Sequence, residues 1–404
     1  MLGQATPGAM RVVHMLPVWA PAWQYGGPVH SVGRLCDGLA AAGVTVEVLT
    51  TTAGLPDWPA ERTGVPLQLS GVTVTYHPVD RHGPGPIRSR ALLAALPRHL
   101  AQADLLHLSA VWQALGPAVQ RAAHAAGVPV VHSLRGALGP YSLRRGLWKK
   151  LPYHWLVERP LLLRARALHV TSLQEERELD PPWLGLGRRR RPPLVRLPNP
   201  LALPDPDPSA DRAAWRRDHG LDPHERLLLV CGRHHHKKGL DLLPPLLQRL
   251  AQRPWRLLLV GPDEDGSAAR LERQLTRAGL ADRLRRWPLQ DGDSLPALFR
   301  AADLLLMPSR HENFGNVAVE ALACGCPVLL SPAVGAGADL AAVLDGQPWG
   351  AVVPRRVETW QAWLDPWLAQ PPARPDPAAL AAWTGQAAVA RAWCRVYADL
   401  LGRP

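Results

Sequence analysis

Short runs of apolar residues alternate with longer segments whose apolar residues recur at helical spacing. In the first half of the chain these runs cover residues 11–16, 44–50, 103–109, 128–133, 167–172 and 193–199. Turn-forming residues bound each run, as expected for buried strands. The Ala/Leu-rich segments between them, such as residues 31–43, have the apolar period of helices. This repeated strand–helix–strand order predicts parallel sheets covered by helices on both faces.

The alternation starts again in the second half, with apolar runs at residues 226–232, 253–262, 282–289, 302–309 and 326–332. The Pro/Asp-rich stretch at 198–215 indicates an exposed connection between the two series. We therefore expect two doubly wound, Rossmann-like α/β domains, at residues 1–198 and 199–380, that face each other across a cleft. Residues 381–404 are predicted to be a helix that packs back on the first domain. Ligands of such sheets sit at the carboxyl ends of the strands.

Composition narrows the class of protein. The 404 residues suffice for two domains, each with its own core. A formal net charge of +12 favours anionic partners such as phosphorylated small molecules, lipid headgroups or nucleic acid. An arginine-rich genome would produce the same excess. No stretch approaches the roughly 18 to 20 apolar residues that span a bilayer, and the start lacks a secretory pattern, so we expect a cytoplasmic protein.

The five cysteines are scattered and follow no disulfide or zinc pattern. Cys324 and Cys326 form a C-x-C without a partner pair at ligand spacing. We therefore expect reduced thiols.

Candidate chemistry begins with the stretch CGRHHHKKGLDLL, which follows the strand at residues 226–232 and leads into a helix. Arg233 and Lys238 would lie in a loop at the carboxyl end of that strand. Two cations five residues apart suit a diphosphate, because each can neutralise a phosphate oxygen. The alternative is a pair of solvated surface cations. The three histidines at 234–236 suggest a metal, but successive residues in a loop do not easily face one ion, and surface exposure is the better interpretation.

A second stretch, SRHENFGNVAVEALACGCPVLL, places Glu312 in the loop after a strand and Glu320 about one turn inside the next predicted helix. The amides at the start of that helix, at Gly315 and Asn316, suit an anionic group. Taken singly, each glutamate is equally compatible with a capping or surface role.

Together these stretches resemble a known family. The pattern E-N-F-G-N-x-x-x-E-A-L-A-x-G-x-P-V is similar to the E-x7-E signature of retaining GT-B glycosyltransferases of family 4, and G-R-x4-K-G lies about 75 residues upstream of it. The Gly-Gly loop WQYGGPVHSVGRL and the segments LPNP and VGPDEDG resemble the family in the same order. The resemblance extends over residues 11–402 and implies the GT-B fold, with its two facing Rossmann-like domains, and hexosyl transfer from a nucleotide sugar.

The resemblance also implies residue roles. Arg233 and Lys238 would hold the donor diphosphate and stabilise it as the leaving group, and Glu312 would contact the donor sugar. Glu320 would bind the ribose, and the amides of Phe314, Gly315 and Asn316 would lie against sugar and phosphate. Gly26 and Gly27 would let the N-terminal loop approach the diphosphate.

One position departs from the family. Many members carry histidine in a T-x-H-G turn of the first domain, where this chain has Ser133-Leu134-Arg135-Gly136. A similar S-x-R-G-A-L turn occurs in members of polysaccharide-assembly type. Arg135 and His132 are candidate acceptor or supporting residues, and His107 is a nearby alternative, although core or strand-end roles suit both histidines. No single general base is identified. A same-face route, in which the leaving phosphate takes the acceptor's proton, would need none.

Residues 142–167 mix basic residues with tryptophan and tyrosine, and residues 188–191 are all arginine. Such a segment suits an anionic membrane surface, but a solvated helix face with buried aromatics is an equal alternative. We expect a saccharide acceptor, with a lipid-linked intermediate of cell-surface polysaccharide as the leading choice and peripheral association with the inner face of the plasma membrane. A small soluble acceptor is the alternative.

Other functions and a metal requirement are disfavoured. Nothing resembles a nucleic-acid-binding module, so nucleic acid is not an expected partner, and the intact signature residues argue against an inactive scaffold. We expect no cofactor and no divalent metal, because Arg233 and Lys238 already supply two positive charges. Among three D-x-D-like pairs, at residues 205–207, 263–265 and 291–293, only Asp263 and Asp265 follow a strand closely enough to be serious metal candidates.

Overall fold

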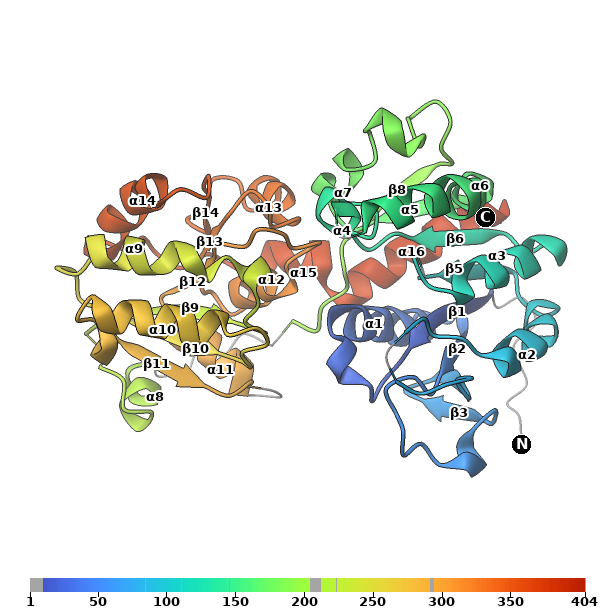
Figure 1. The fold of residues 1–404 in the computed structure, drawn as a ribbon, viewed down its shortest axis with the longest axis horizontal. Coiled ribbons are helices and arrows are strands. Elements are labelled where there is room, and N and C mark those ends of the chain that lie inside the picture. The colour runs from blue at the N-terminus through green and yellow to red at the C-terminus, as the bar shows by residue number, and fades with distance from the viewer. Residues whose placement is uncertain are drawn as a thin grey trace. The chain divides into compact units, whose positions relative to one another are not determined.

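The computed structural model describes residues 10–83, 85–109, 111–144, 146–203, 212–222, 224–290 and 294–403. The chain forms two compact units, one of residues 1–202 together with 384–404, and one of residues 203–383 (Figure 1). The divisions fall after Ala202 and after Trp383, whereas the sequence placed them after residues 198 and 380.

The sheet of the first unit has eight strands in the order β3-β4-β2-β1-β5-β6-β7-β8. Apart from the edge strand β3, which pairs antiparallel with β4, its neighbours are parallel. In chain order, the run from β4 to β7 reads 3-2-1-4-5-6, the doubly wound order of dinucleotide-binding folds. The strands are β1 Arg11–Val18, β2 Thr45–Thr51, β3 Pro66–Leu69, β4 Val72–His77, β5 Leu105–Leu108, β6 Val130–Ser133, β7 Ala167–Val170 and β8 Leu194–Arg196.

Helices cover both faces of this sheet. On one face α1 and α16 bury leucine, tryptophan and tyrosine side chains against the strands, with Trp393 and Tyr397 contributed by α16. On the other face α2 and α3 pack through Leu92, Leu96 and Val119. The helices are α1 Gly27–Ala41, α2 Arg90–Leu100, α3 Leu115–Ala125, α4 Pro140–Arg144, α5 Leu147–Tyr153, the π-helical turn η3 His154–Glu158, α6 Arg159–Arg164, α7 Leu173–Arg177 and α16 Gln386–Leu401, with short 3-10 turns η1 Trp23–Tyr25, η2 Ala60–Arg62 and η4 Pro182–Leu184.

The second unit repeats the same strand order in a six-stranded parallel sheet, β11-β10-β9-β12-β13-β14. Its core is leucine-rich around the buried Trp255 and Trp360. The strands are β9 Arg226–Cys231, β10 Trp255–Val260, β11 Leu284–Trp287, β12 Leu304–Met307, β13 Val328–Leu330 and β14 Gly350–Val352. The helices are α8 Arg212–Asp218, η5 His236–Lys238, η6 Leu240–Leu242, α9 Leu243–Arg249, α10 Ser267–Arg277, η7 Ala281–Arg283, α11 Ser294–Ala301, α12 Asn316–Ala323, α13 Gly337–Val343, α14 Val357–Ala369 and α15 Ala378–Thr384.

The predicted fold class is confirmed, and every apolar run named from the sequence contains a strand. Three strands were missed: β3, β4 and β14. The C-terminal segment forms two helices, α15 and α16, which are separated at Gly385. Within the described residues, no helix is both long and apolar enough to cross a membrane.

Candidate functional site

Two signature residues of the second unit are hydrogen-bonded to each other. Lys238 ends η5, in the loop after β9, and Glu312 lies in the loop after β12. Because β9 and β12 are neighbours from which the chain winds in opposite directions, the carboxyl ends of these strands form the topological switch point, where doubly wound sheets bind ligands. The Lys238 ammonium donates to the Glu312 carboxylate, and both side chains are mostly buried. The sequence had given the two residues separate partners.

Gly239 allows the Lys238 loop to pack tightly against the loop after β12. Its φ is +65°, and a Cβ there would lie 2.1 Å from the Pro308 carbonyl oxygen. Arg355 donates to the carbonyls of Pro308 and Gly239, at 2.8 and 2.9 Å, and to Asp241 at 2.6 Å. Sequence reasoning missed Arg355 and Asp241, because the two residues lie more than a hundred positions apart and no local pattern predicts their contact.

Arg233 has a different partner from the one expected of a phosphate-binding residue. Its Nη1 lies 2.9 Å from the Glu264 carboxylate, in the loop after β10, and half of its side chain is exposed. An incoming diphosphate would therefore have to replace Glu264 as the partner of Arg233.

The start of α12 has the geometry that the E-x7-E segment predicted. Gly315 is the N-cap with φ +95°, and a Cβ there would lie 2.7 Å from Val334 Cγ1, so glycine is required. Asn316 is the first residue of the helix, and the Phe314 ring is buried against Trp383, with ring centroids 5.8 Å apart.

Glu320 lies inside α12 and is half-buried. Its negative charge adds to the effect of burial in raising the pKa of the Cys231 thiol to about 12. Since Cys231 ends β9, the Glu320 carboxylate is near the same strand end as the Lys238 loop.

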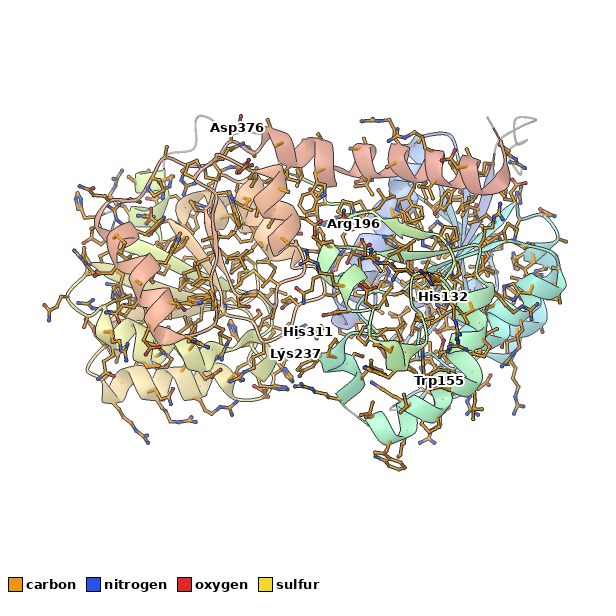
Figure 2. All side chains as sticks on the ribbon, turned by 90° about the horizontal axis from the view of Figure 1, so that it is seen from above. His132, Trp155, Arg196, Lys237, His311 and Asp376 are labelled. Carbon is orange, nitrogen blue, oxygen red and sulfur yellow. The ribbon has the colours of Figure 1, made fainter. Side chains whose placement is uncertain are left out.

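The prediction that the three histidines lie on the surface is wrong for His234. This side chain is only 1% exposed, and burial lowers its pKa to about 4. His235 is half-buried and His236 is exposed (the neighbouring Lys237 and His311 are labelled in Figure 2).

The His235 Nε2 and His236 Nδ1 atoms lie 3.8 and 3.4 Å from Asp265 Oδ2, and these three groups are close enough together to hold a metal ion. The sequence did not anticipate this grouping.

The two aspartates considered as metal candidates have structural partners. Asp263 accepts hydrogen bonds from the amides of Ala268 and Ala269 in the first turn of α10, at 3.2 and 3.0 Å. Asp265 accepts from Ser267, a bond that is the main cause of the lowered pKa of its carboxyl group, and from the amide of His236 at 2.8 Å. The pairs at 205–207 and 291–293, and Arg145 of the basic segment, lie outside the described residues.

The corresponding switch point of the first unit lies between β1 and β5. A cavity of about 260 Å³ at this position is lined by the ends of β1 and β6 and the loops after β5 and β6, with Tyr25 and Pro28 beside them. Gly26, with φ +77°, is the N-cap of α1, and Gly27 begins the helix with no atom within 4 Å of a Cβ placed on it. Gly27 therefore leaves open space next to Pro28, which lines this cavity.

Arg135 lines the cavity, but His132 does not. His132 is buried in β6, burial lowers its pKa to about 3, and neither of its ring nitrogens has a hydrogen-bond partner among the described residues. His107 is also buried, and it is bonded to Tyr397 and Ser133. Both histidines are core residues, as the sequence-based alternative allowed.

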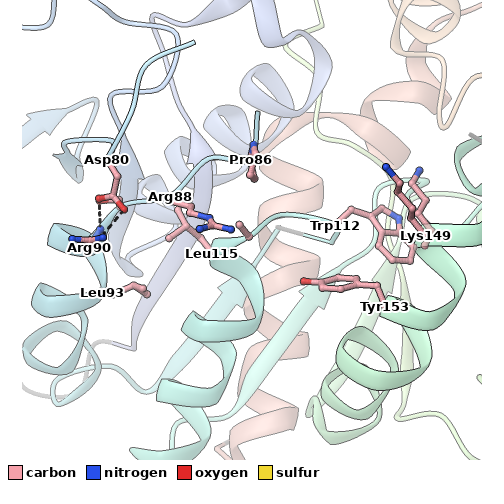
Figure 3. Close-up of a pocket in the computed structure, with 12 residues that line it drawn as sticks. Asp80, Pro86, Arg88, Arg90, Leu93, Trp112, Leu115, Lys149 and Tyr153 are labelled. Carbon is pink, nitrogen blue, oxygen red and sulfur yellow. Dashed lines mark hydrogen bonds and ion pairs between the residues drawn. The ribbon is translucent and has the colours of Figure 1, made fainter. Parts of the chain in front are cut away.

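A larger groove of about 730 Å³ on the first unit is lined by basic and aromatic side chains (Figure 3). Arg88, Lys149 and Lys150 supply positive charge, while Arg90 is paired with Asp80. Trp112 and Tyr153 supply flat apolar surface of the kind against which sugar rings pack.

An exposed surface follows along the same helices, which we call the aromatic surface: Leu147, Trp148, Trp155, Leu156 and Trp183. Trp148 is 75% and Leu156 78% exposed, and Figure 2 shows Trp155 on the outer helices of this unit. Lys149 and Arg159 lie over the Trp148 and Trp155 rings, each 4.6 Å from the ring centroid. The alternative interpretation from the sequence, a helix face with buried aromatics, is wrong for these residues.

Comparison with known proteins gives the class. Two family models match the chain, "Glycosyl transferase 4-like domain" at residues 26–200 and "Glycosyl transferases group 1" at residues 211–377. Sucrose-phosphate synthase from Thermosynechococcus elongatus has the same fold, with a TM-score of 0.71, 22% identity and coverage of 97% of this chain and 99% of that one. A structure of Anabaena HepE in complex with UDP and glucose has a TM-score of 0.64 and 19% identity, with coverage of 97% of this chain and 95% of that one. The fold is that of a GT-B glycosyltransferase.

A D-inositol 3-phosphate glycosyltransferase from Jonesia denitrificans is 30% identical over 373 residues, which are 87% of this chain and 85% of that protein. The chain belongs to the group 1 glycosyltransferase family, with a family 4-like first domain. Relatives of the same name from Segniliparus rotundus and from a Mycobacterium strain match over only 36% and 55% of their own length.

Proposed function

We propose that this protein transfers a hexosyl group from a nucleotide sugar to a hydroxyl of an acceptor, with retention at the anomeric carbon. The Lys238–Glu312 pair at the switch point of the second unit carries the proposal, because it sets a cation and a carboxylate side by side where a doubly wound sheet binds nucleotides. The UDP and glucose in the HepE structure support the donor class.

In the proposed reaction, negative charge grows on the diphosphate as the glycosidic bond breaks. Lys238 would exchange Glu312 for the diphosphate, and Arg233 would exchange Glu264, so that both cations stabilise the leaving group. Glu312, once released, is free to accept hydrogen bonds from the donor sugar. Glu320 keeps its assignment to the ribose, and Gly26, Gly27 and the amides of Phe314, Gly315 and Asn316 keep theirs as donor contacts.

The acceptor is proposed to be small and soluble. Relatives that match over 87% and 61% of this chain are named D-inositol 3-phosphate glycosyltransferase, and this supports a small acceptor better than a lipid-linked one. The basic and aromatic groove beside Trp112 suits a saccharide that carries negative charge (Figure 3).

A lipid-linked saccharide is the second candidate, favoured by the aromatic surface. Exposed tryptophans with cations over their rings are suited to the headgroup region of an anionic bilayer. We propose that this surface makes peripheral contact with such a membrane, whichever acceptor is used.

Turnover with a panel of nucleotide sugars tests the proposal, with inositol phosphate and a lipid-diphosphate-linked saccharide as acceptors in parallel. The anomeric configuration of the product, read by NMR, tests retention. Transfer from no nucleotide sugar to either acceptor by the folded protein would overturn the proposal.

A further inference from the structure

The cavity at the switch point of the first unit has one charged residue in its wall. Polar side chains line it at Tyr25, Ser109, Gln113 and Ser133, and the other lining residues apart from Arg135 are apolar. At about 260 Å³ it is smaller than the pockets of roughly 300–1,000 Å³ that take drug-sized ligands, so it suits a group of monosaccharide size.

The Arg135 guanidinium donates only to neutral groups. Its Nε lies 3.2 Å from Ser109 Oγ, and its Nη1 lies 3.1 Å from Ser31 Oγ and 3.3 Å from Asn199 Oδ1. Nη2 has no hydrogen-bond acceptor among the described residues. Arginine offers five donors in a planar fork that matches a carboxylate or phosphate. The Nη2 donors are therefore available to a ligand.

The one carboxylate whose charge acts on Arg135 already has other partners. Glu175 accepts from the Gly136 amide through one oxygen and from the amide and hydroxyl of Thr171 through the other, at 2.7 and 2.8 Å. Burial lowers the pKa of Arg135 to about 10, so it stays charged at neutral pH. A partly buried cation without a hydrogen-bonded carboxylate is an unusual feature that calls for an anionic partner.

The backbone of Arg135 is held in a conformation that costs energy. Its φ is +49°, in the left-handed region that favours glycine. The turn is fixed on both sides, by the Gly136 amide on Glu175 and by the Leu134 amide on the His169 carbonyl at 2.9 Å. Strain of this kind persists where the surroundings enforce it, and it clusters at ligand sites.

A buried hydrogen-bond chain anchors the residue at the base of this turn. The Leu197 carbonyl can only accept, so His169 donates to it from Nε2 at 2.9 Å, and His169 Nδ1 accepts from the Ser133 hydroxyl at 2.6 Å. Ser133 in turn accepts from His107 Nε2 at 2.6 Å, and His107 Nδ1 accepts from the Tyr397 hydroxyl at 2.5 Å. Each donor is matched, both rings are neutral, and Ser133 is fixed in the cavity wall.

We propose that Arg135 and this cavity form a binding site for an oxyanion, a phosphoryl or carboxylate group attached to a sugar-sized polyol. The charge, the unused Nη2 donors and the enforced backbone each point to that ligand class. This site adds a charged substrate group to the proposed function. Its role in turnover rests on that function, whereas the binding of an oxyanion does not. The oxyanion belongs to the acceptor.

Isothermal titration calorimetry tests this site. The probes are myo-inositol 3-phosphate, glucuronate, myo-inositol and UDP, each added to the wild type, Arg135→Gln and Arg62→Gln, the last a matched change at an exposed arginine of η2 away from the cavity. The acceptor probes are also tested with UDP present. We expect the wild type and Arg62→Gln to bind at least one anionic polyol tenfold or more tightly than Arg135→Gln does, and all three proteins to bind UDP alike. A loss confined to UDP would contradict the site.

The wild type alone gives a second measurement if Arg135→Gln does not fold. It should bind myo-inositol 3-phosphate or glucuronate at least tenfold more tightly than neutral myo-inositol. Equal affinity of wild type and folded Arg135→Gln for every polyol, or a wild type without that preference, would overturn the site. Sugar transfer that persists with unchanged KM in Arg135→Gln would remove this site and leave the proposed function intact. Arg135-dependent anion binding without any sugar transfer would support this site and overturn the proposed function.

Discussion

Lys238 and Glu312 come from loops that follow two adjacent parallel strands, and their side chains are hydrogen-bonded to each other across the switch point of the second unit. The Glu312 carboxylate neutralises the charge of the mostly buried Lys238 ammonium. A diphosphate carries more charge than a carboxylate, so it can take over Lys238 and leave Glu312 available to the sugar.

Replacing the cations should reduce turnover far more than stability. In Lys238→Ala or Arg233→Ala the leaving diphosphate loses a fixed positive charge worth about 3 kcal/mol, which corresponds to a fall in kcat of about a hundredfold or more. Steady-state kinetics with thermal melts as the folding control measure this. Arg277→Ala, at the last residue of α10, provides a matched loss of a cation elsewhere in the unit. Near-normal kcat in either folded variant would remove that residue from the mechanism.

The two signature glutamates should separate kinetically. Glu312→Gln removes the charge that occupies Lys238, so nucleoside diphosphate should bind as well as before or more tightly, while turnover falls. Glu320→Ala should mainly weaken nucleotide binding. Calorimetry with nucleoside diphosphate, set beside kcat for each variant, checks the difference. Equal losses of turnover with unchanged nucleotide affinity in both variants would contradict the assignment.

Activity should survive excess chelator. Two cations already face the diphosphate in the proposed complex. Asp263 accepts hydrogen bonds from amides in the first turn of α10, and Asp265 accepts one from the Ser267 hydroxyl at the start of that helix. Turnover measured before and after treatment with EDTA tests this. Loss of activity that magnesium, manganese or zinc restores would show the opposite, and a matching loss in His236→Ala would locate the ion at His235, His236 and Asp265.

Vesicles with anionic lipid should bind the protein, and salt should release it, because exposed charges are screened within about 10 Å at 0.1 M ionic strength. Leu156→Ser should weaken the binding. Leu289→Ser changes another exposed leucine, in the second unit, and should leave it unchanged. Equal sedimentation with neutral and anionic vesicles would rule out the electrostatic contribution, and equal binding by the two variants would rule out the aromatic surface.

Glu158 should make the folded state less stable as the pH rises. Burial raises the pKa of its carboxyl group from 4.5 to about 7, so the folded state disfavours the charged form. The loss of folding free energy begins as the pH passes 4.5 and grows until the pH passes about 7. Above that pH it stays constant at up to about 3 kcal/mol. Glu158→Gln should therefore raise the melting temperature at pH 8.5 but not at pH 4.5. Glu61→Gln, an exposed control in η2, should change neither. A gain that is equal at both pH values would exclude charge burial as the cause.

The fold was largely predictable because its buried strands are continuous apolar runs. Residues 226–231 and 255–260 are examples, each flanked by turn residues. The missed strands lack that signal. Strand β3 is an exposed edge strand that begins with proline, and β14 is three half-buried residues. Strand β4 alternates valine with threonine, a half-buried pattern, although its neighbours bury both of its faces.

The positions of the candidate residues at strand ends were predictable from the sequence, but the partners of their side chains were not. Spacing placed Lys238 and Glu312 in loops at strand ends, and the order of the strands then brought those loops together. That order, and hence the Lys238–Glu312 bond, is a tertiary property. The same holds for Arg233 with Glu264 and for the burial of His234, whose flanking residues all read as a solvated loop.

The helix α16 has a consequence for the order in which the protein is made. Trp393 and Tyr397 fill the core of the first unit, and Tyr397 is the terminal donor of the buried chain through His107. Domains usually fold one after another as a ribosome releases them, the N-terminal one first. Here the second unit is a single continuous stretch that emerges whole, while the first waits for residues 384–404, which follow the second unit in the chain. The N-terminal unit is therefore expected to be the last to reach its native core during translation.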